Sequence, residues 1–126
     1  MASVINLTPH LVTIVSPECA EYNNRTRSYN LVGDLKIVCE IPATENNIPR
    51  CSVAEADADA IEDIPTIKLE YGEVEYLPAP QDGVYFIVSA ITANAARQTG
   101  RTDLLTVARM VRNSEGQILG CLALAR

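Results

Sequence analysis

The chain has 126 residues, of which 48% are hydrophobic and 21% are charged. This length and composition predict one globular domain over residues 1–126 and argue against a disordered or collagen-like chain. The net charge of −6 also argues against a protein whose whole surface coats nucleic acid.

The first third of the chain alternates apolar runs with polar segments. Residues 4–7 and 11–15 are rich in β-branched side chains and are predicted to be strands, with a Thr-Pro-His break between them. Residues 16–34 are polar and predict a long loop, which in so small a domain is uncommon and usually functional. Residues 35–41 predict the next strand, which ends at Pro42.

The middle third is rich in turn residues and acids. Residues 42–50 predict a turn-rich connection, and residues 50–53 predict a short strand. Residues 55–60 form a small acidic patch, which we interpret as a solvated loop or a frayed turn. Residues 64–70 and 74–77 are predicted to be strands, and residues 78–83 are predicted to form a turn.

The last third carries the clearest signals. Residues 84–88 form a continuous apolar run typical of a buried central strand. Ser89 is a good N-cap for an alanine-rich helix over residues 90–98, and Gly100 ends it. Residues 104–112 and 117–124 are predicted to be strands, and the loop at residues 113–116 joins them into a β-hairpin. The prediction is therefore an α+β fold, mainly antiparallel β-sheet with one principal helix (about 89–99) and a C-terminal β-hairpin.

The negative charge is distributed unevenly along the chain. Residues 1–96 hold five basic and fourteen acidic residues, a balance of −9, whereas residues 97–126 hold five arginines against two acids, a balance of +3. Eight of the ten basic residues are arginine, whose planar fork suits phosphate recognition. A local anion site is therefore one interpretation. The alternatives are arginines paired with the many acids, or a genome whose codons favour arginine.

The four cysteines predict neither a metal site nor disulfides. They are Cys19, Cys39, Cys51 and Cys121, and no two of them form a Cys-x-x-Cys motif. The first residues lack a basic region followed by an apolar one, and no apolar run reaches the roughly 18 residues of a membrane span. We therefore expect a soluble, cytoplasmic protein with reduced thiols.

The common catalytic signatures are missing from the sequence. It has no Gly-x-Ser-x-Gly, His-Glu-x-x-His or Walker motif, and His10 is the only histidine. His10 is interpreted either as a turn histidine bonded to nearby backbone or as a ligand contact or general base. Asp57, Asp59 and Asp63 lack the glycine and the glutamate of a calcium loop, so a solvated acidic loop is the simpler interpretation. We expect no enzyme activity, no metal and no cofactor.

The segment that starts at Phe86 holds parts that could bind a nucleotide. Asn94 and Arg97 have the i, i+3 spacing of neighbours on one helix face. Arg109 and Arg112 would point to opposite faces of a regular strand, so they could meet one ligand only if the backbone is irregular there. Phe86 could stack on a base or simply pack in the core. The arginines could likewise bind phosphate or pair with acids.

Several short phrases, taken in order, resemble a known group of proteins. They are Ile-Asn-Leu-Thr-Pro-His at residues 5–10, Gly-Glu-Val-Glu-Tyr-Leu-Pro at 72–78 with Pro80, Tyr-Phe-Ile-Val-Ser at 85–89, Arg-Thr-Asp-Leu at 101–104 and Arg-Asn-Ser-Glu-Gly-Gln-Ile-Leu-Gly-Cys at 112–121. Their order resembles small phage and prophage proteins that open with Asn-Leu-Thr-Pro-His. Within this group the chain resembles the phage anti-Thoeris sponges of the first type. Residues 16–34 and 54–63 do not match that pattern and are interpreted as additions.

The resemblance implies binding without catalysis. Such sponges sequester the cyclic ADP-ribose isomer made by a bacterial TIR-domain enzyme, so that the defence effector is never activated. They assemble as homodimers and larger rings such as hexamers, and some hold cyclic di- or trinucleotides at a separate site between subunits. The implied partners are a cyclic nucleotide and further copies of the chain, with no DNA and no membrane. The alternative function is a phage structural or assembly protein with no small ligand.

The resemblance also implies a set of ligand contacts. The residues carried over for the ADP-ribose pocket are Phe86, Asn94, Arg109 and Arg112. The aromatic ring would stack on adenine, the amide would bond base or ribose, and the arginines would hold the diphosphate. Tyr85 is an alternative stacking residue, and Arg97 is a further contact. For a second site no motif aligns, and charge and position alone suggest Arg25, Arg27 and His10.

Overall fold

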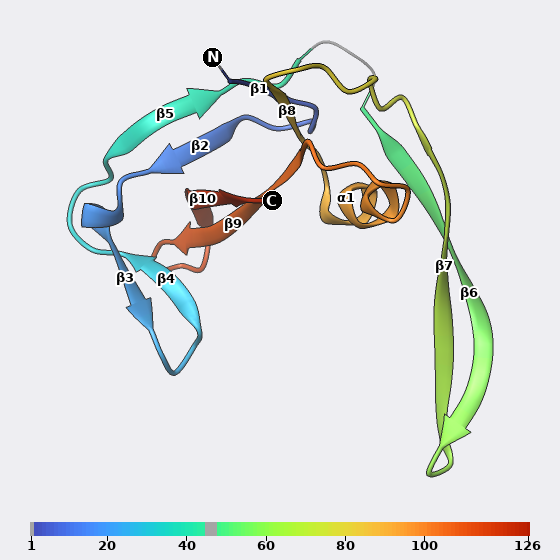
Figure 1. Cartoon of the computed structure of the whole chain (residues 1–126). Helices are drawn as coiled ribbons and strands as arrows, with labels where there is room; N and C mark the ends of the chain where they lie inside the picture. Colours follow the sequence, from blue (N-terminus) through green and yellow to red (C-terminus); the bar gives the residue numbers. More distant parts are fainter. Residues whose placement is uncertain (1, 45–47) are drawn as a thin grey trace.

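The computed structural model describes residues 2–44 and 48–126, and Figure 1 shows how their elements are arranged. The elements in chain order are β1 (Ser3–Asn6), β2 (Val12–Val15), the 3₁₀ helix η1 (Pro17–Cys19), β3 (Ala20–Asn23), β4 (Ser28–Leu31), β5 (Ile37–Ile41), β6 (Arg50–Ile61), β7 (Ile64–Glu75), β8 (Val84–Ile87), α1 (Ala90–Arg97), β9 (Leu104–Arg112) and β10 (Ile118–Ala125). The predicted α+β fold class is confirmed. Residues 45–47 of the predicted 42–50 connection lie outside the described residues. No described helix has the length and apolar character that crossing a membrane requires.

Eight strands form one mixed sheet. Six of them follow the order β1-β8-β9-β10-β2-β5, and the other two join at β9, where β4 pairs with β9 and β3 pairs with β4. The pairs β9–β10, β2–β5 and β3–β4 are antiparallel, whereas β1–β8, β8–β9, β10–β2 and β4–β9 are parallel. Strand β9 is central because β10 runs along one side of it while β8 and β4 pair with the two ends of the other side. Among the described strands, none pairs with the stretch of β9 between β8 and β4.

The main core lies between α1 and the sheet. Phe86 and Val88, at 1% and 3% exposure, pack with Leu104 of β9 and with Ala93 and Ala96 of α1. Burial of one large apolar side chain contributes about 1.5–3 kcal/mol, so this layer is a main source of stability. In the apolar run at residues 84–88, Val84 and Tyr85 are half-buried and residues 86–88 are buried, as expected for a strand with neighbours on both sides.

The helix forms where the sequence predicts it. The Ser89 hydroxyl accepts from the Thr92 amide at 3.3 Å and satisfies one of the free N–H groups of the first turn. The alanines that favour the helix also form its buried face, because their small side chains allow close approach to the sheet. Gly100, with φ of +98°, lies in the turn that follows, where a left-handed backbone favours glycine.

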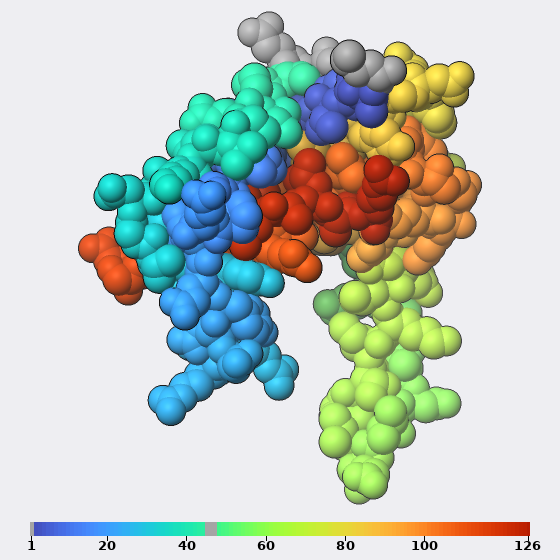
Figure 2. All heavy atoms as spheres, turned by 60° about the vertical axis from the view of Figure 1, so that its left-hand side comes forward, coloured from blue at the N-terminus to red at the C-terminus, as the bar shows by residue number. Residues whose placement is uncertain are grey.

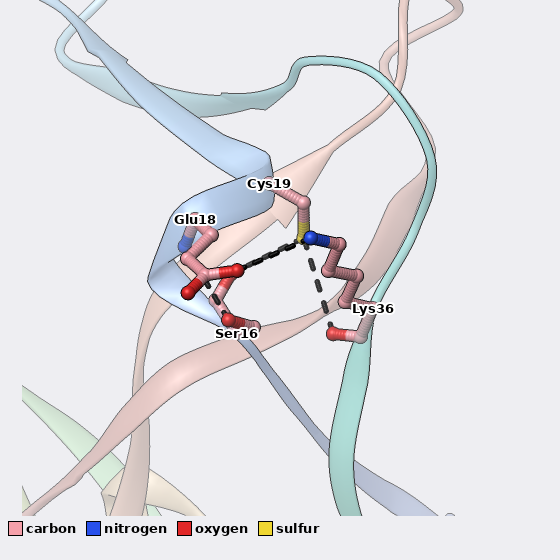
Figure 3. Close-up of polar contacts among 4 residues, drawn as sticks. All are labelled: Ser16, Glu18, Cys19 and Lys36. Atoms are coloured by element: carbon pink, nitrogen blue, oxygen red, sulfur yellow. Dashed lines mark hydrogen bonds and ion pairs between the residues drawn. The ribbon is translucent and has the colours of Figure 1, made fainter.

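The predicted loop at residues 16–34 is wrong, because this segment is structured. It contains η1 and an antiparallel hairpin of β3 and β4. Figure 3 shows how its start is held: Ser16 caps η1, the Cys19 thiol donates to the Ser16 carbonyl at 3.2 Å, and Lys36 reaches Glu18 at 3.1 Å. The polar hairpin is stabilised by pairing rather than by apolar alternation, with the rings of Tyr22 and Tyr29 5.0 Å apart across the two strands.

The acidic patch at residues 55–60 is also not a loop. It lies within β6, which pairs with β7 to form a long two-stranded hairpin that projects from the body in Figure 1, and which we call the arm. At its tip, Ile61 pairs with Ile64 across Glu62 and Asp63, whose φ angles of +50° and +65° are those of a type I′ turn. The tip lacks the usual Asn-Gly pair, so the sequence carries only a weak turn signal there.

The C-terminal hairpin of β9 and β10 confirms the sequence prediction. The side-chain oxygen of Asn113 accepts from the amides of Glu115 and Gln117, both at 2.9 Å, and so closes the loop. In β10, Gly120 is required by the close approach of the neighbouring strand β2. A Cβ there would lie 2.6 Å from a methyl of Val15 and 2.7 Å from the carbonyl of Thr13, so only glycine lets β2 approach β10 this closely.

Candidate functional site: an arginine-lined cleft

The most suggestive chemistry gathers at the C-terminal end of β9, against the β3–β4 hairpin. There β4 runs parallel to β9, with Tyr29 opposite Val111. A cleft of about 460 Å³ lies at this junction, within the usual size range of ligand pockets. We name it the arginine cleft, and its lining residues are Thr26, Arg27, Ser28, Tyr29, Arg109, Met110 and Arg112.

The backbone at Arg109 explains how two arginines three positions apart reach the same cleft. Arg109 has a φ of +54°, a left-handed conformation within a strand. The register with β10 is kept on both sides of it, with Ala108 opposite Ala123 and Met110 opposite Cys121. Further along, the pairing shifts by one residue, since Val111 lies opposite Gly120 and Arg112 lies opposite Ile118. The strand is therefore irregular both at Arg109 and just before Arg112, so the strict alternation that would send the two side chains to opposite faces does not apply to this stretch. The irregular backbone that the sequence required for a shared site is therefore present.

Arg27 enters the cleft from the turn of the β3–β4 hairpin. Its φ is +55°, so it too adopts the left-handed conformation that costs energy for a residue other than glycine. The turn is held by Asn23, whose side-chain oxygen accepts from the amides of Arg25 and Thr26 at 2.9 and 3.3 Å. Two strained arginines at one cleft indicate that the surrounding structure holds both in place.

No carboxylate neutralises the arginine cleft within the described residues. The ion pairs among residues 2–44 and 48–126 are Lys36–Glu18 and Arg101–Asp103, and neither involves an arginine of the cleft. Arg112 donates through Nη1 to the Gly116 carbonyl at 3.0 Å, which orients its guanidinium. The alternative that these arginines pair with acids is thus not seen in the described part of the chain.

The structure does not unite the four residues carried over from the family resemblance. Phe86 is buried at 1% exposure and pairs in register with Leu104, at the opposite end of β9 from the cleft. Leu104 and Arg109 are five positions apart along the strand, which is roughly 17 Å at the usual rise per residue. Asn94 lies exposed on α1, which packs near that same end. In one chain, only Arg109 and Arg112 of the four line the cleft.

The two further candidates near Phe86 have contacts of their own. Tyr85 is half-buried, and the guanidinium of Arg126 lies 5.1 Å from the centre of its ring. Arg97 donates to the Leu104 carbonyl at 3.4 Å, near the end of α1. Both side chains therefore lie at the helix end of the sheet rather than at the arginine cleft.

The three residues suggested for a second site do not gather in one place. Arg27 belongs to the arginine cleft, whereas Arg25 lines a separate cleft of about 570 Å³ on the β3–β4 hairpin with Glu21, Asn24 and Tyr22. His10 is exposed and lines an apolar groove with Leu11, Val107, Met110 and Ile118. Its backbone carbonyl accepts from Asn6, as expected of a residue in a turn.

Sequence reasoning missed Tyr29, which supplies the aromatic surface of the arginine cleft. The signal was present: Tyr22 and Tyr29 directly flank the polar Asn-Asn-Arg-Thr-Arg-Ser segment, as cross-strand partners at the two sides of a turn do. The assignment of residues 16–34 to a loop hid this pairing.

Arg101 and Asp103 form a largely buried ion pair at the start of β9. Their side chains are 16% and 13% exposed, and two nitrogens of Arg101 donate to the two carboxylate oxygens of Asp103, each at 2.9 Å. Arg101 also donates to the Pro78 carbonyl at 2.9 Å and so holds the 78–83 turn. The hydrogen bond from Arg101 lowers the pKa of Asp103 below its ordinary value of 3.8, against the opposing effect of burial.

We expect acid to remove this stabilisation. Since the pKa of Asp103 is lowered in the folded state, its contribution is complete above about pH 4 and is lost as the pH falls through the folded value. Asp103→Asn should therefore reduce the free energy of unfolding by about 2 kcal/mol at pH 7 and by progressively less below pH 4. Urea unfolding between pH 7 and pH 2.5 measures this. Asp82→Asn, in the adjacent turn, controls for the loss of one charge, and a difference for Asp103→Asn that is constant with pH would contradict the prediction.

The acids and cysteines do not form a metal site in the described chain. Asp57, Asp59 and Asp63 are spread along the arm and its tip, and residues 2–44 and 48–126 contain no group of three or more potential ligands that could hold an ion. Cys39 is exposed, whereas Cys121 is buried, and this burial raises the pKa of the Cys121 thiol.

No family model, curated protein or solved structure matches this chain. The resemblance to anti-Thoeris sponges therefore stays a prediction from short sequence phrases.

Proposed function

We propose that this protein binds and sequesters a cyclic nucleotide signal, a cyclic ADP-ribose isomer, and thereby blocks bacterial anti-phage defence without cleaving the signal. One observation carries the proposal: three arginines from two distant segments line one cleft, and no described acid pairs with them. Such a cleft suits a ligand with more than one phosphate, because each guanidinium can donate two parallel hydrogen bonds to phosphate oxygens.

The other lining groups fit the remaining parts of a nucleotide. Tyr29 offers an aromatic surface for a base, and Thr26 and Ser28 offer hydroxyls for ribose or phosphate. The two hydroxyls are 2.7 Å apart and hydrogen-bonded to each other, so they are already ordered without a ligand. The net charge of −6 on the whole chain complements this arrangement, since it disfavours nonspecific binding of nucleic acid outside the cleft.

The lining of the arginine cleft supports binding rather than cleavage. Its described residues include hydroxyls but no histidine, cysteine or carboxylate to activate them as nucleophiles. A sponge also needs slow release, which charge-assisted hydrogen bonds from several arginines favour. Cytoplasmic location and assembly into dimers or hexamers belong to the same proposal.

The test is capture followed by intact release. Purified protein is incubated with each cyclic ADP-ribose isomer, separated from free ligand by filtration and heated, and the released molecule is identified by mass spectrometry. We expect depletion of the filtrate and recovery of an unchanged mass. An altered mass would indicate an enzyme. No capture, with flat thermal-shift curves for cyclic di- and trinucleotides too, would favour the phage assembly protein.

A further inference from the structure

The arginine cleft lies beside a gap in the sheet. On the side of β9 that faces away from β10, β8 pairs with Leu104 and Leu105, and β4 pairs with Val111 and Arg112. Residues 106–110 lie between these two pairings, and among the described strands only β10 pairs with them. We call these residues the open stretch of β9. At the usual rise, the distance from Leu105 to Val111 is roughly 20 Å, so the gap is long enough to admit a nucleoside.

The gap and the arginine cleft are continuous. Arg109 and Met110 belong to the open stretch, and both line the cleft together with Tyr29 of β4. Figure 2 shows the β3–β4 hairpin and the arm projecting from the same side of the body, with open space between them. A ligand whose diphosphate lies on the arginines can therefore place its base against the backbone of β9, beside Tyr29.

The backbone of the open stretch directs one acceptor and one donor into the gap. The Val88 amide donates to the Leu105 carbonyl at 2.9 Å, so the polar backbone groups of Leu105 point away from β10. Alternate residues of a strand direct these groups to the same side, so Val107 and Arg109 direct theirs into the gap. The left-handed φ of Arg109 turns the chain only after its own N–H, which keeps this direction. Among residues 2–44 and 48–126, no hydrogen bond reaches the Val107 carbonyl or the Arg109 amide from that side.

We propose that the backbone of the open stretch recognises the base of the bound nucleotide and selects adenine. The Val107 carbonyl accepts from the exocyclic amine of adenine, and the Arg109 amide donates to the neighbouring ring nitrogen N1. The arginines hold the diphosphate at one end, so the base enters the gap in one orientation. Hypoxanthine carries an oxygen in place of the amine and a proton on N1, so it sets acceptor against acceptor and donor against donor. The inference rests on the proposed function, because it names the groups that give the same site its base specificity.

The first test compares a captured cyclic ADP-ribose isomer with the same molecule after deamination of its adenine to hypoxanthine. Deamination leaves the phosphates, the riboses and the size of the base unchanged, so a difference in Kd reports on the edge of the base. We expect the Kd of the deaminated form to be at least roughly 10²-fold higher, because two hydrogen bonds are replaced by two repulsive contacts. Equal Kd values would overturn the inference and leave the proposed function standing. Capture of neither molecule would overturn the proposed function, and the inference with it.

The second test separates the backbone of β9 from the polar side chains of the cleft. Thr26→Val with Ser28→Ala, and separately Arg112→Gln, should keep the ratio of the two Kd values within about twofold of the wild type, whatever their effect on each value. Loss of the discrimination in either variant would assign base recognition to a side chain instead. In amide exchange followed by NMR, the captured isomer should slow the Arg109 amide at least roughly tenfold and leave the Glu62 amide at the tip of the arm unchanged. An Arg109 amide that exchanges equally fast in the saturated complex would also overturn the inference.

Discussion

Arg109→Asn combined with Arg112→Gln is expected to abolish capture of a cyclic ADP-ribose isomer. Each lost charge-assisted hydrogen bond costs about 1.5–3 kcal/mol, so the pair of changes should weaken binding by roughly 10²–10⁴-fold. Asparagine is chosen at position 109 because it tolerates the left-handed backbone found there, with φ of +54°. The fold should therefore persist while the guanidinium groups are removed. Isothermal calorimetry and the filtration assay measure the loss.

The matched control is Arg25→Gln. Arg25 lies on the same β3–β4 hairpin but lines a different cleft, and its substitution removes the same charge. Capture should remain within about twofold of the wild type, since a surface charge outside the contact acts only through screened, long-range attraction. Equal loss in both variants would point to net charge rather than to the arginine cleft. Undiminished binding in the Arg109/Arg112 variant would refute the site.

Asn6→Ala is expected to cause the largest loss of stability from a single polar side chain. Asn6 is 1% exposed, and its amide nitrogen donates to the carbonyls of His10 and Ile41 at 2.7 and 2.9 Å. Its oxygen accepts from the amide and the hydroxyl of Thr8, at 2.9 and 2.6 Å. Alanine leaves these groups without their partner, so we expect the free energy of unfolding to fall by about 3 kcal/mol. That is a large fraction of the roughly 5–15 kcal/mol of a typical domain.

Urea unfolding followed by circular dichroism tests this expectation. Asn94→Ala is the control, because Asn94 lies exposed on α1, where alanine is an excellent helix former. It should change the free energy of unfolding by no more than about 0.5 kcal/mol. If Asn6→Ala were equally mild, the Asn-Leu-Thr-Pro-His segment would not be the structural link between β1 and β5 that its hydrogen bonds describe.

The elements that sequence reasoning predicted well are those with strong local signals. The helix follows from the Ser89 cap and its alanines, and the C-terminal hairpin from two apolar runs about an Asn-to-Gly loop. The β3–β4 hairpin and the acidic part of β6 escaped prediction because these strands are polar and exposed, whereas residues 50–53 and 64–70 were predicted as strands and lie in β6 and β7. Their pairing is stabilised by cross-strand neighbours such as Tyr22 and Tyr29, and such contacts leave little periodicity in the sequence.

The candidate site was predictable only in part. The sequence pointed to Arg109 and Arg112, and it stated the condition that both could share a site only on irregular backbone. From charge and position alone it assigned Arg27 to a different site, and 82 positions of sequence separate Arg27 from Arg109. The parallel pairing of β4 with β9 is what places them together. Phe86, in contrast, has the apolar neighbours of a core residue, and the structure places it in the core.

The sequence alone determines that the chain is acidic, has the composition of a globular protein and carries most of its basic charge as arginine. Local patterns likewise determine the helix, the buried strand at residues 84–88 and the C-terminal hairpin, because short-range hydrogen bonds and apolar periodicity act between neighbours in the chain. Which arginines converge, and why Phe86 lies far from them, depends on the pairings of β9 with β4 and with β8. Those pairings join residues far apart in sequence, so they are settled only when the whole chain packs.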